Sequence, residues 1–253
     1  MKLHLSPVVA VSRATLLTTS LGMACVSHGA VNPITWSGAS GTDPTAWADG
    51  TNWVGNAAPT DDLVTDAAVF DLADFTGKQP NAGTRSVAGI QIGSGTATGA
   101  LTLSGTALTL GASGIAMQAN AGAATISSPV ALGATQTWSN ASTNALTVGG
   151  IVSGTGFNLA KSGSGTLVLT GANSYTGSTS VSGGTLQLGN GTIQPTINST
   201  YDIASGATLR IQYNTAGSAA QTWSKYTGAG TLALTSGKNS DGGWGQADRK
   251  SVV

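Results

Sequence analysis

The chain has 253 residues, 37 glycines and a formal net charge of zero, and only 8% of its residues are charged. Globular proteins average about 25% charged residues, so this shortage excludes the extended basic surface that nucleic acid requires. The apolar share of 40% also argues against a disordered chain, which combines low hydrophobicity with high charge.

Residues 1–30 are predicted to be a secretory signal peptide. Two basic residues precede an apolar run from Ala14 to Val26, and small residues follow as far as Ala30, which is the layout of such a signal. The run is too short to span a bilayer as a stable helix. We expect cleavage after Ala30 and export by the secretion machinery; the alternative is a lipoprotein signal that modifies Cys25, the only cysteine.

Residues 31–75 are predicted to form an N-terminal cap rich in tryptophan and aspartate. The segment holds seven of the ten aspartates and three of the six tryptophans. In one interpretation the tryptophans pack over the first coil and the aspartates close turns. In the other, the segment stacks on sugars or binds Ca²⁺ through Asp61, Asp62 and Asp66. Because calcium needs more ligands than these three supply, we favour the cap.

Residues 76–238 carry a repeat in which two aliphatic residues flank one other residue between glycines, serines and threonines. The pairs begin at Ile90, Leu108, Leu146, Leu167, Leu186, Leu209 and Leu232, and the weaker segment ATISS at Ile126 fills the one large gap. Alternation of this kind is typical of strands, and repeats this short bury their apolar faces only by stacking. We therefore predict eight stacked turns of a parallel β-helix, with the leucines inward and Thr166, Val168, Thr170 and Gln187 outward or at the edges.

The clearest repeat unit is residues 161–191, KSGSGTLVLTGANSYTGSTSVSGGTLQLGNG. It resembles the autotransporter-associated β-strand repeat, also called the passenger-associated transport repeat. The structural positions of that motif are matched by Leu167, Leu169, Gly171, Asn173, Tyr175, Gly177, Leu186 and Leu188. The segment from Trp36 to Phe70 is also similar to the sequence that opens such regions. The resemblance implies a right-handed β-helix, export, and a role in translocation or surface display, and it brings no catalytic residues.

Within this unit, GANSYTG is interpreted as a turn rather than a ligand site. Asparagine tolerates a left-handed backbone, so we expect Asn173 to adopt one and Tyr175 to cover the corner. Trp138 and Trp223, each in a QTWS sequence, are expected at equivalent corners of different coils, and their matching context favours packing. If both were exposed on one face, they could stack on sugar rings.

No catalytic, cofactor-binding or metal site is predicted. There is no glutamate, no Asp, Lys or Arg occurs between Ser86 and Ala160, and both histidines lie in the first thirty residues. General acid–base catalysis needs titratable groups near the substrate, and glycoside hydrolysis needs paired carboxylates.

Residues 239–253 lack the repeat pattern and are expected to be a fragment end or unrelated sequence. A C-terminal β-barrel translocator would then be a partner outside this chain.

Together these features predict an all-β, right-handed parallel β-helix with an N-terminal cap. The expected function is a non-enzymatic passenger region that is secreted or held at the cell surface in association with the outer membrane. The alternative is an adhesin that binds a surface glycan, and a polysaccharide lyase of the pectin-lyase-like fold is disfavoured. No cofactor and no nucleic-acid partner are expected.

Overall fold

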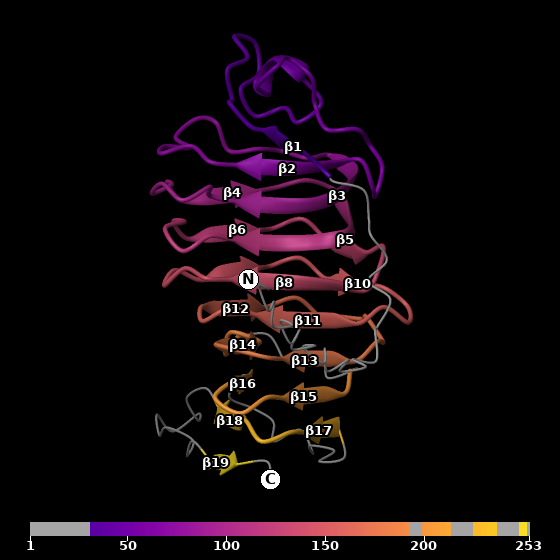
Figure 1. Ribbon diagram of the computed structural model, residues 1–253, viewed down its shortest axis with the longest axis vertical. Helices are drawn as coiled ribbons and strands as arrows, with labels where there is room; N and C mark the ends of the chain where they lie inside the picture. Colours follow the sequence, from indigo (N-terminus) through magenta and orange to yellow (C-terminus); the bar gives the residue numbers. More distant parts are fainter. Residues whose placement is uncertain (1–30, 193–198, 214–224, 237–247, 252–253) are drawn as a thin grey trace, which may run out of the picture.

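The computed structural model describes residues 31–192, 199–213, 225–236 and 248–251. These residues form a parallel β-solenoid of about seven turns (Figure 1), which confirms the predicted all-β fold. One short 3₁₀ turn, η1 (Gly50–Asn52), is the helical element within these ranges. The predicted signal peptide, Trp223 and most of the predicted tail lie outside the described residues.

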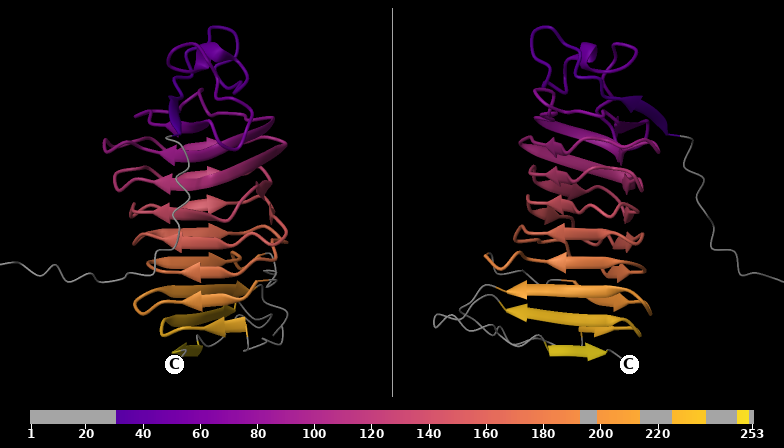
Figure 2. Two further views of the ribbon diagram at one scale, coloured as in Figure 1. Left: turned by 45° about the vertical axis from the view of Figure 1, so that its right-hand side comes forward. Right: turned by 90° about the vertical axis from the view of Figure 1, so that its left-hand side faces the viewer.

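Two sheets form the long sides of the solenoid, and successive turns stack along its axis (Figures 1 and 2). The eleven-stranded sheet contains β1 (Asn32–Thr35), β2 (Asp66–Phe70), β3 (Thr84–Ile92), β5 (Ala107–Met117), β7 (Val130–Leu132), β8 (Gln136–Asn140), β10 (Val152–Ser153), β11 (Leu159–Ser162), β13 (Thr179–Val181), β15 (Tyr201–Ile203) and β17 (Tyr226–Thr227). The eight-stranded sheet contains β4 (Leu101–Leu103), β6 (Ala124–Ile126), β9 (Leu146–Val148), β12 (Thr166–Leu169), β14 (Thr185–Leu188), β16 (Thr208–Tyr213), β18 (Thr231–Ser236) and β19 (Asp248–Ser251). All these strands pair in parallel except β18 with β19, which are antiparallel.

The core is a set of aliphatic columns that run along the solenoid axis. In the eight-stranded sheet, one column contains Leu101, Ala124, Leu146, Leu167, Leu186, Leu209 and Leu232, all buried. Alternate residues such as Val168 and Gln187 are only partly buried, because successive side chains of a strand point to opposite faces. The predicted division into inward leucines and outward neighbours is confirmed.

The predicted register of the first turns is wrong. Ile90 pairs with Ile115, and Leu108 pairs with Arg85, so both pairs belong to the eleven-stranded sheet. The equivalent strand of the eight-stranded sheet begins at Leu101, and equivalent residues there recur at intervals of 19 to 23. Leu108 in β5 and Ile126 in β6 lie on two sides of one turn but were counted as successive turns, which explains why eight turns were expected where about seven occur.

The long strands β3 and β5 explain the miscount, since each covers two sides of the solenoid. A register irregularity between Val87 and Gly89 bends the pair. Before this bend, β5 pairs with β7, and after it β5 pairs with β8. Both halves alternate apolar and small residues, so periodicity alone does not separate them.

The N-terminal segment lies over one end of the solenoid (Figure 1). Trp36, Trp47 and Trp53 are fully buried, and their rings lie 5.6 to 6.2 Å from the ring of Phe70 in β2, centroid to centroid. Trp47 and Trp53 are 4.9 Å apart at 67°, an edge-to-face arrangement that aromatic pairs favour. The cap therefore extends the apolar interior beyond the first strands.

Aspartates of this segment accept hydrogen bonds that close its turns. Asp43 accepts hydrogen bonds from both the main-chain N–H and the hydroxyl of Thr45, and Asp49 does the same with Thr51. These bonds stabilise the ionised carboxylates and lower the pKa of both groups. Asp62 is bound in the same way by Thr65, and hydrogen bonds led by the Thr65 hydroxyl lower its pKa to about 2.

The sheet edges at this end are also covered. The side-chain amide of Gln79 covers the edge of β4: it accepts from the N–H of Thr102 (2.5 Å) and donates to the carbonyl of Ala100 (3.0 Å). In β1, Pro33 has no N–H to present, and the N–H of Val54 donates to the carbonyl of Thr35. Blocking an exposed edge prevents pairing with other chains.

We expect the substitution Leu167→Ala to destabilise the solenoid far more than Val168→Ala, its neighbour on β12. Leu167 is completely buried, whereas Val168 lies on the outward side. Truncating a buried leucine costs about 2–5 kcal/mol, and a surface change costs roughly 0.5 kcal/mol or less. Urea unfolding followed by circular dichroism would measure both, and equal midpoints for the two variants would contradict the inward assignment.

Candidate functional site

The eight sequence-predicted positions lie on two consecutive turns, from β12 through β14. Leu167 and Leu169 of β12 pair in register with Leu186 and Leu188 of β14, and all four side chains are buried. Their contribution is to the packed interior, and none of them presents a reactive group.

Gly171 and Gly177 allow neighbouring turns to approach closely. A Cβ atom added at Gly171 would lie 2.5 Å from the carbonyl oxygen of Gly150, and one added at Gly177 would lie 1.9 Å from that of Phe157. Both distances are below any tolerable contact, and the obstacle is backbone, which cannot swing aside as a side chain can. At these two positions only glycine lets the turns stack.

Asn173 continues the ladder of main-chain hydrogen bonds with its side chain. One turn earlier, the N–H of Val130 donates to a main-chain carbonyl, that of Ile151 (2.9 Å). The N–H of Val152 instead donates to Oδ1 of Asn173 (2.9 Å), while the N–H of Ser174 donates to the carbonyl of Val152. The predicted left-handed backbone is wrong, because Asn56 is the only described residue other than glycine with a positive φ.

Tyr175 is buried inside the solenoid and begins a chain of hydroxyl contacts. Its hydroxyl lies 3.0 Å from Oγ1 of Thr179, which lies 2.8 Å from Oγ of Ser199. Ser199 in turn donates to the carbonyl of Gly177 (2.6 Å). Burial raises the pKa of Tyr175, so the phenol stays protonated and serves to join neighbouring turns.

Lys161 is a central residue of this region that sequence reasoning missed. No role was assigned to it from the sequence, yet its side chain is 0% exposed. The ammonium group donates to the carbonyl oxygens of Ser162, Gly163 and Gly183, each at 2.9 Å. These bonds use all three of its N–H donors and join its own turn to the next one.

The position of Lys161 in β11 was the available signal. Leu159 and Lys161 are both buried, whereas the intervening Ala160 is only partly buried, so alternation places the lysine inward. Burial lowers its pKa to about 8 from the ordinary value of 10.5. Desolvation outweighs the benefit of the three carbonyl contacts, and the amine is enclosed rather than open to a substrate.

Trp138 is packed in the interior, as its sequence context favoured, but it lies within a strand rather than at a corner of the coil. It is fully buried on β8, between Ile115 and Lys161 of the neighbouring strands. Its indole N–H donates to Oε1 of Gln136 (2.8 Å). This tryptophan therefore cannot stack on a sugar ring, and Trp223 lies outside the described residues.

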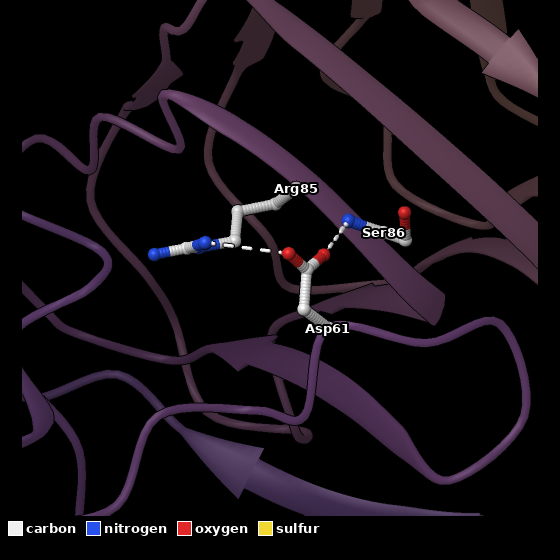
Figure 3. Close-up of polar contacts among 3 residues, drawn as sticks. All are labelled: Asp61, Arg85 and Ser86. Carbon is white, nitrogen blue, oxygen red and sulfur yellow. Dashed lines mark hydrogen bonds and ion pairs between the residues drawn. The ribbon is translucent and has the colours of Figure 1, made fainter.

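Charged groups of the described residues meet in one ion pair, where the cap contacts β3 (Figure 3). Asp61 lies 3.3 Å from Nη1 of Arg85 and accepts from the N–H of Ser86 (2.5 Å). Asp62 and Asp66 bind threonines instead.

The part of the chain that the structure describes contains no group of three His, Cys, Asp or Glu side chains that could hold a metal ion. None of the helices in that part is long and apolar enough to cross a membrane.

The same junction holds a groove of about 240 Å³, here called the cap groove. One wall is residues 43 and 45–48 of the cap, and the other is residues 81–85, which lead into β3. Hydrogen bonds between the walls fix its shape: Asn81 N–H donates to the carbonyl of Thr45 (2.7 Å), and Trp47 N–H donates to that of Asn81 (3.1 Å).

Comparison with known proteins identifies the segment that contains Lys161 and the predicted repeat positions. A family model described as the passenger-associated-transport-repeat matches residues 159–188. This part of the chain is therefore a repeat of that family, which confirms the predicted resemblance. Searches of curated proteins and of solved structures found no match.

We expect Lys161 to make the stability of the solenoid depend on pH in the alkaline range. Because its pKa is about 8 when folded and 10.5 ordinarily, the unfolded chain binds more protons between these values. The free energy of unfolding should then rise by roughly 1 kcal/mol per pH unit from pH 8 to 9.5. Above about pH 10 the trend should reverse, since the raised pKa values of Tyr175 and Tyr201 favour deprotonation of the unfolded chain.

The measurement is a series of urea unfolding curves between pH 7 and 9.5. Lys161→Met should abolish the rise, and the matched variant Lys78→Met, in the cap region, should keep it. A rise of the same size in Lys161→Met would show that another group is responsible.

Proposed function

We propose that this chain, which carries a passenger-associated-transport-repeat, is an exported and non-enzymatic passenger region, secreted or displayed at the cell surface. Its β-solenoid would form a stiff rod that assembles turn by turn and holds attached regions away from the cell. The observation that carries the proposal is the family match at residues 159–188, which falls on consecutive turns of the stack.

The use of polar groups in these turns supports a structural role. The amide of Asn173, the ammonium of Lys161 and the hydroxyl of Tyr175 each bind main chain or side chains of neighbouring segments. A catalytic group must remain accessible to its substrate, and these three are buried. The motif thus directs its polar chemistry to joining turns.

The carboxylates described in the cap have a similar use. Asp43, Asp49, Asp62 and Asp74 all have lowered pKa values because hydrogen bonds from nearby threonines stabilise their charged forms. A general acid at neutral pH needs the opposite shift. These aspartates support turn formation rather than proton transfer.

The proposal predicts that the chain will reach the surface of a Gram-negative host when it is joined to the outer-membrane translocator of an autotransporter. Gly177→Ala should lower the surface signal several-fold, because the added Cβ collides with the backbone at Phe157. Gly41→Ala is the matched control, since no atom lies within 4 Å of its added Cβ. The measurement is antibody labelling of an N-terminal tag on intact cells.

Retention of the unsubstituted chain inside the cell would contradict the proposed export. Equal labelling of the Gly177→Ala and Gly41→Ala variants would contradict the link between stacking and export. Immunoblots of whole cells would separate lower surface display from lower synthesis.

A further inference from the structure

The cap groove is bordered by polar side chains from two parts of the chain. Asp43 and Thr45 lie on the cap side, and Asn81, Thr84 and Arg85 lie on the solenoid side. Carboxylate, amide, hydroxyl and guanidinium groups together supply both acceptors and donors. A ligand with many hydroxyl groups, each both donor and acceptor, matches such a mixed wall.

The charges at the groove disfavour an anionic ligand. Arg85 is paired with Asp61 (Figure 3), and Asp43 adds a negative charge whose ionised form is stabilised by hydrogen bonds from Thr45. The positive charge of Arg85 is therefore already balanced, while its remaining N–H groups can still donate. An acidic ligand would meet an uncompensated carboxylate.

Trp47, which lines the groove, carries one of the few unsatisfied buried polar atoms. Its indole Nε1 is buried and has no hydrogen-bond partner, whereas the indoles of Trp36 and Trp53 donate to main-chain carbonyls. A buried donor without an acceptor costs about 1–3 kcal/mol. Because this donor is buried and its ring packs against Trp53 and Phe70, 4.9 and 5.6 Å away between ring centroids, it is not one of the groups offered to a ligand in the groove.

The size of the groove limits the ligand further. Pockets for drug-sized molecules usually measure about 300–1,000 Å³, and the cap groove measures about 240 Å³. It is therefore large enough for one sugar ring but not for an oligosaccharide held along its whole length.

We propose that the cap groove binds one neutral sugar unit, such as the terminal residue of a glycan, through Asp43, Asn81, Thr84 and Arg85. This inference goes beyond the proposed passenger function, because export and display require no ligand. It also differs from the predicted sugar stacking on exposed tryptophans, since Trp36, Trp47, Trp53 and Trp138 are all buried. Affinity should be weak, in the millimolar range, because the groove is small.

Saturation-transfer NMR on the purified chain would test this inference with methyl glycosides of neutral hexoses, pentoses and N-acetylhexosamines. Glucuronate and glucosamine serve as charged comparisons. We expect transfer to at least one neutral glycoside. Ala48→Phe, which places a ring in the groove without removing a hydrogen bond, should weaken binding at least tenfold, while Ala119→Phe, at an exposed alanine elsewhere, should not.

A second pair of variants guards against misfolding of Ala48→Phe. Thr84→Val removes one groove hydroxyl and should weaken binding several-fold, whereas Thr137→Val, on the outer face of β8, should leave it unchanged. The inference is overturned if no neutral glycoside receives saturation, if only charged sugars do, or if Ala48→Phe and Thr84→Val bind as well as their controls. Surface display of the chain would be unaffected by any of these results.

Discussion

Parallel hydrogen bonding between successive turns is the constraint on which the rest of this structure depends. Each strand pairs in register with the strand one turn earlier and one turn later, so every inward side chain stacks on its equivalents. A column accepts only residues that fit its neighbours, and the main chain must approach closely wherever the turns bend. These requirements account for the leucine columns and for glycine at Gly171 and Gly177.

The same constraint determines how the few polar groups are used. Hydrogen-bonding main-chain groups inside or at the ends of the stack need partners, and Lys161, Asn173 and Gln79 supply them from side chains. In the cap, aspartates bind threonines to close turns. The polar side chains named here form hydrogen bonds with main-chain groups of the protein itself, and this agrees with the proposed structural role. In the cap groove, by contrast, polar side chains of two segments border an open space.

The leucine columns, the tryptophan cap and the repeat at residues 159–188 could be predicted because each has a local pattern: alternation, composition or a motif. The register of Ile90 and Leu108 could not, since two sides of one turn alternate alike and only a bend at Val87 separates them. The burial of Lys161 was not predicted because a charge suggests exposure, whereas the interior of a solenoid accepts an ammonium group when neighbouring carbonyls satisfy it. Trp138 was expected to be packed, but at a corner rather than within β8. The cap groove joins segments about forty residues apart, and no local pattern records that contact.

Disulfide cross-linking tests the register most directly. In a chain with Cys25→Ser, the outward residues Gln91 and Ala116 are direct partners on β3 and β5, so the pair Gln91→Cys and Ala116→Cys should oxidise readily within the distance that a disulfide tolerates. The pair Gln91→Cys and Thr109→Cys, which has the 18-residue spacing suggested by the sequence count, should remain reduced under the same conditions. Efficient cross-linking of the second pair in place of the first would contradict the stacking described for this solenoid.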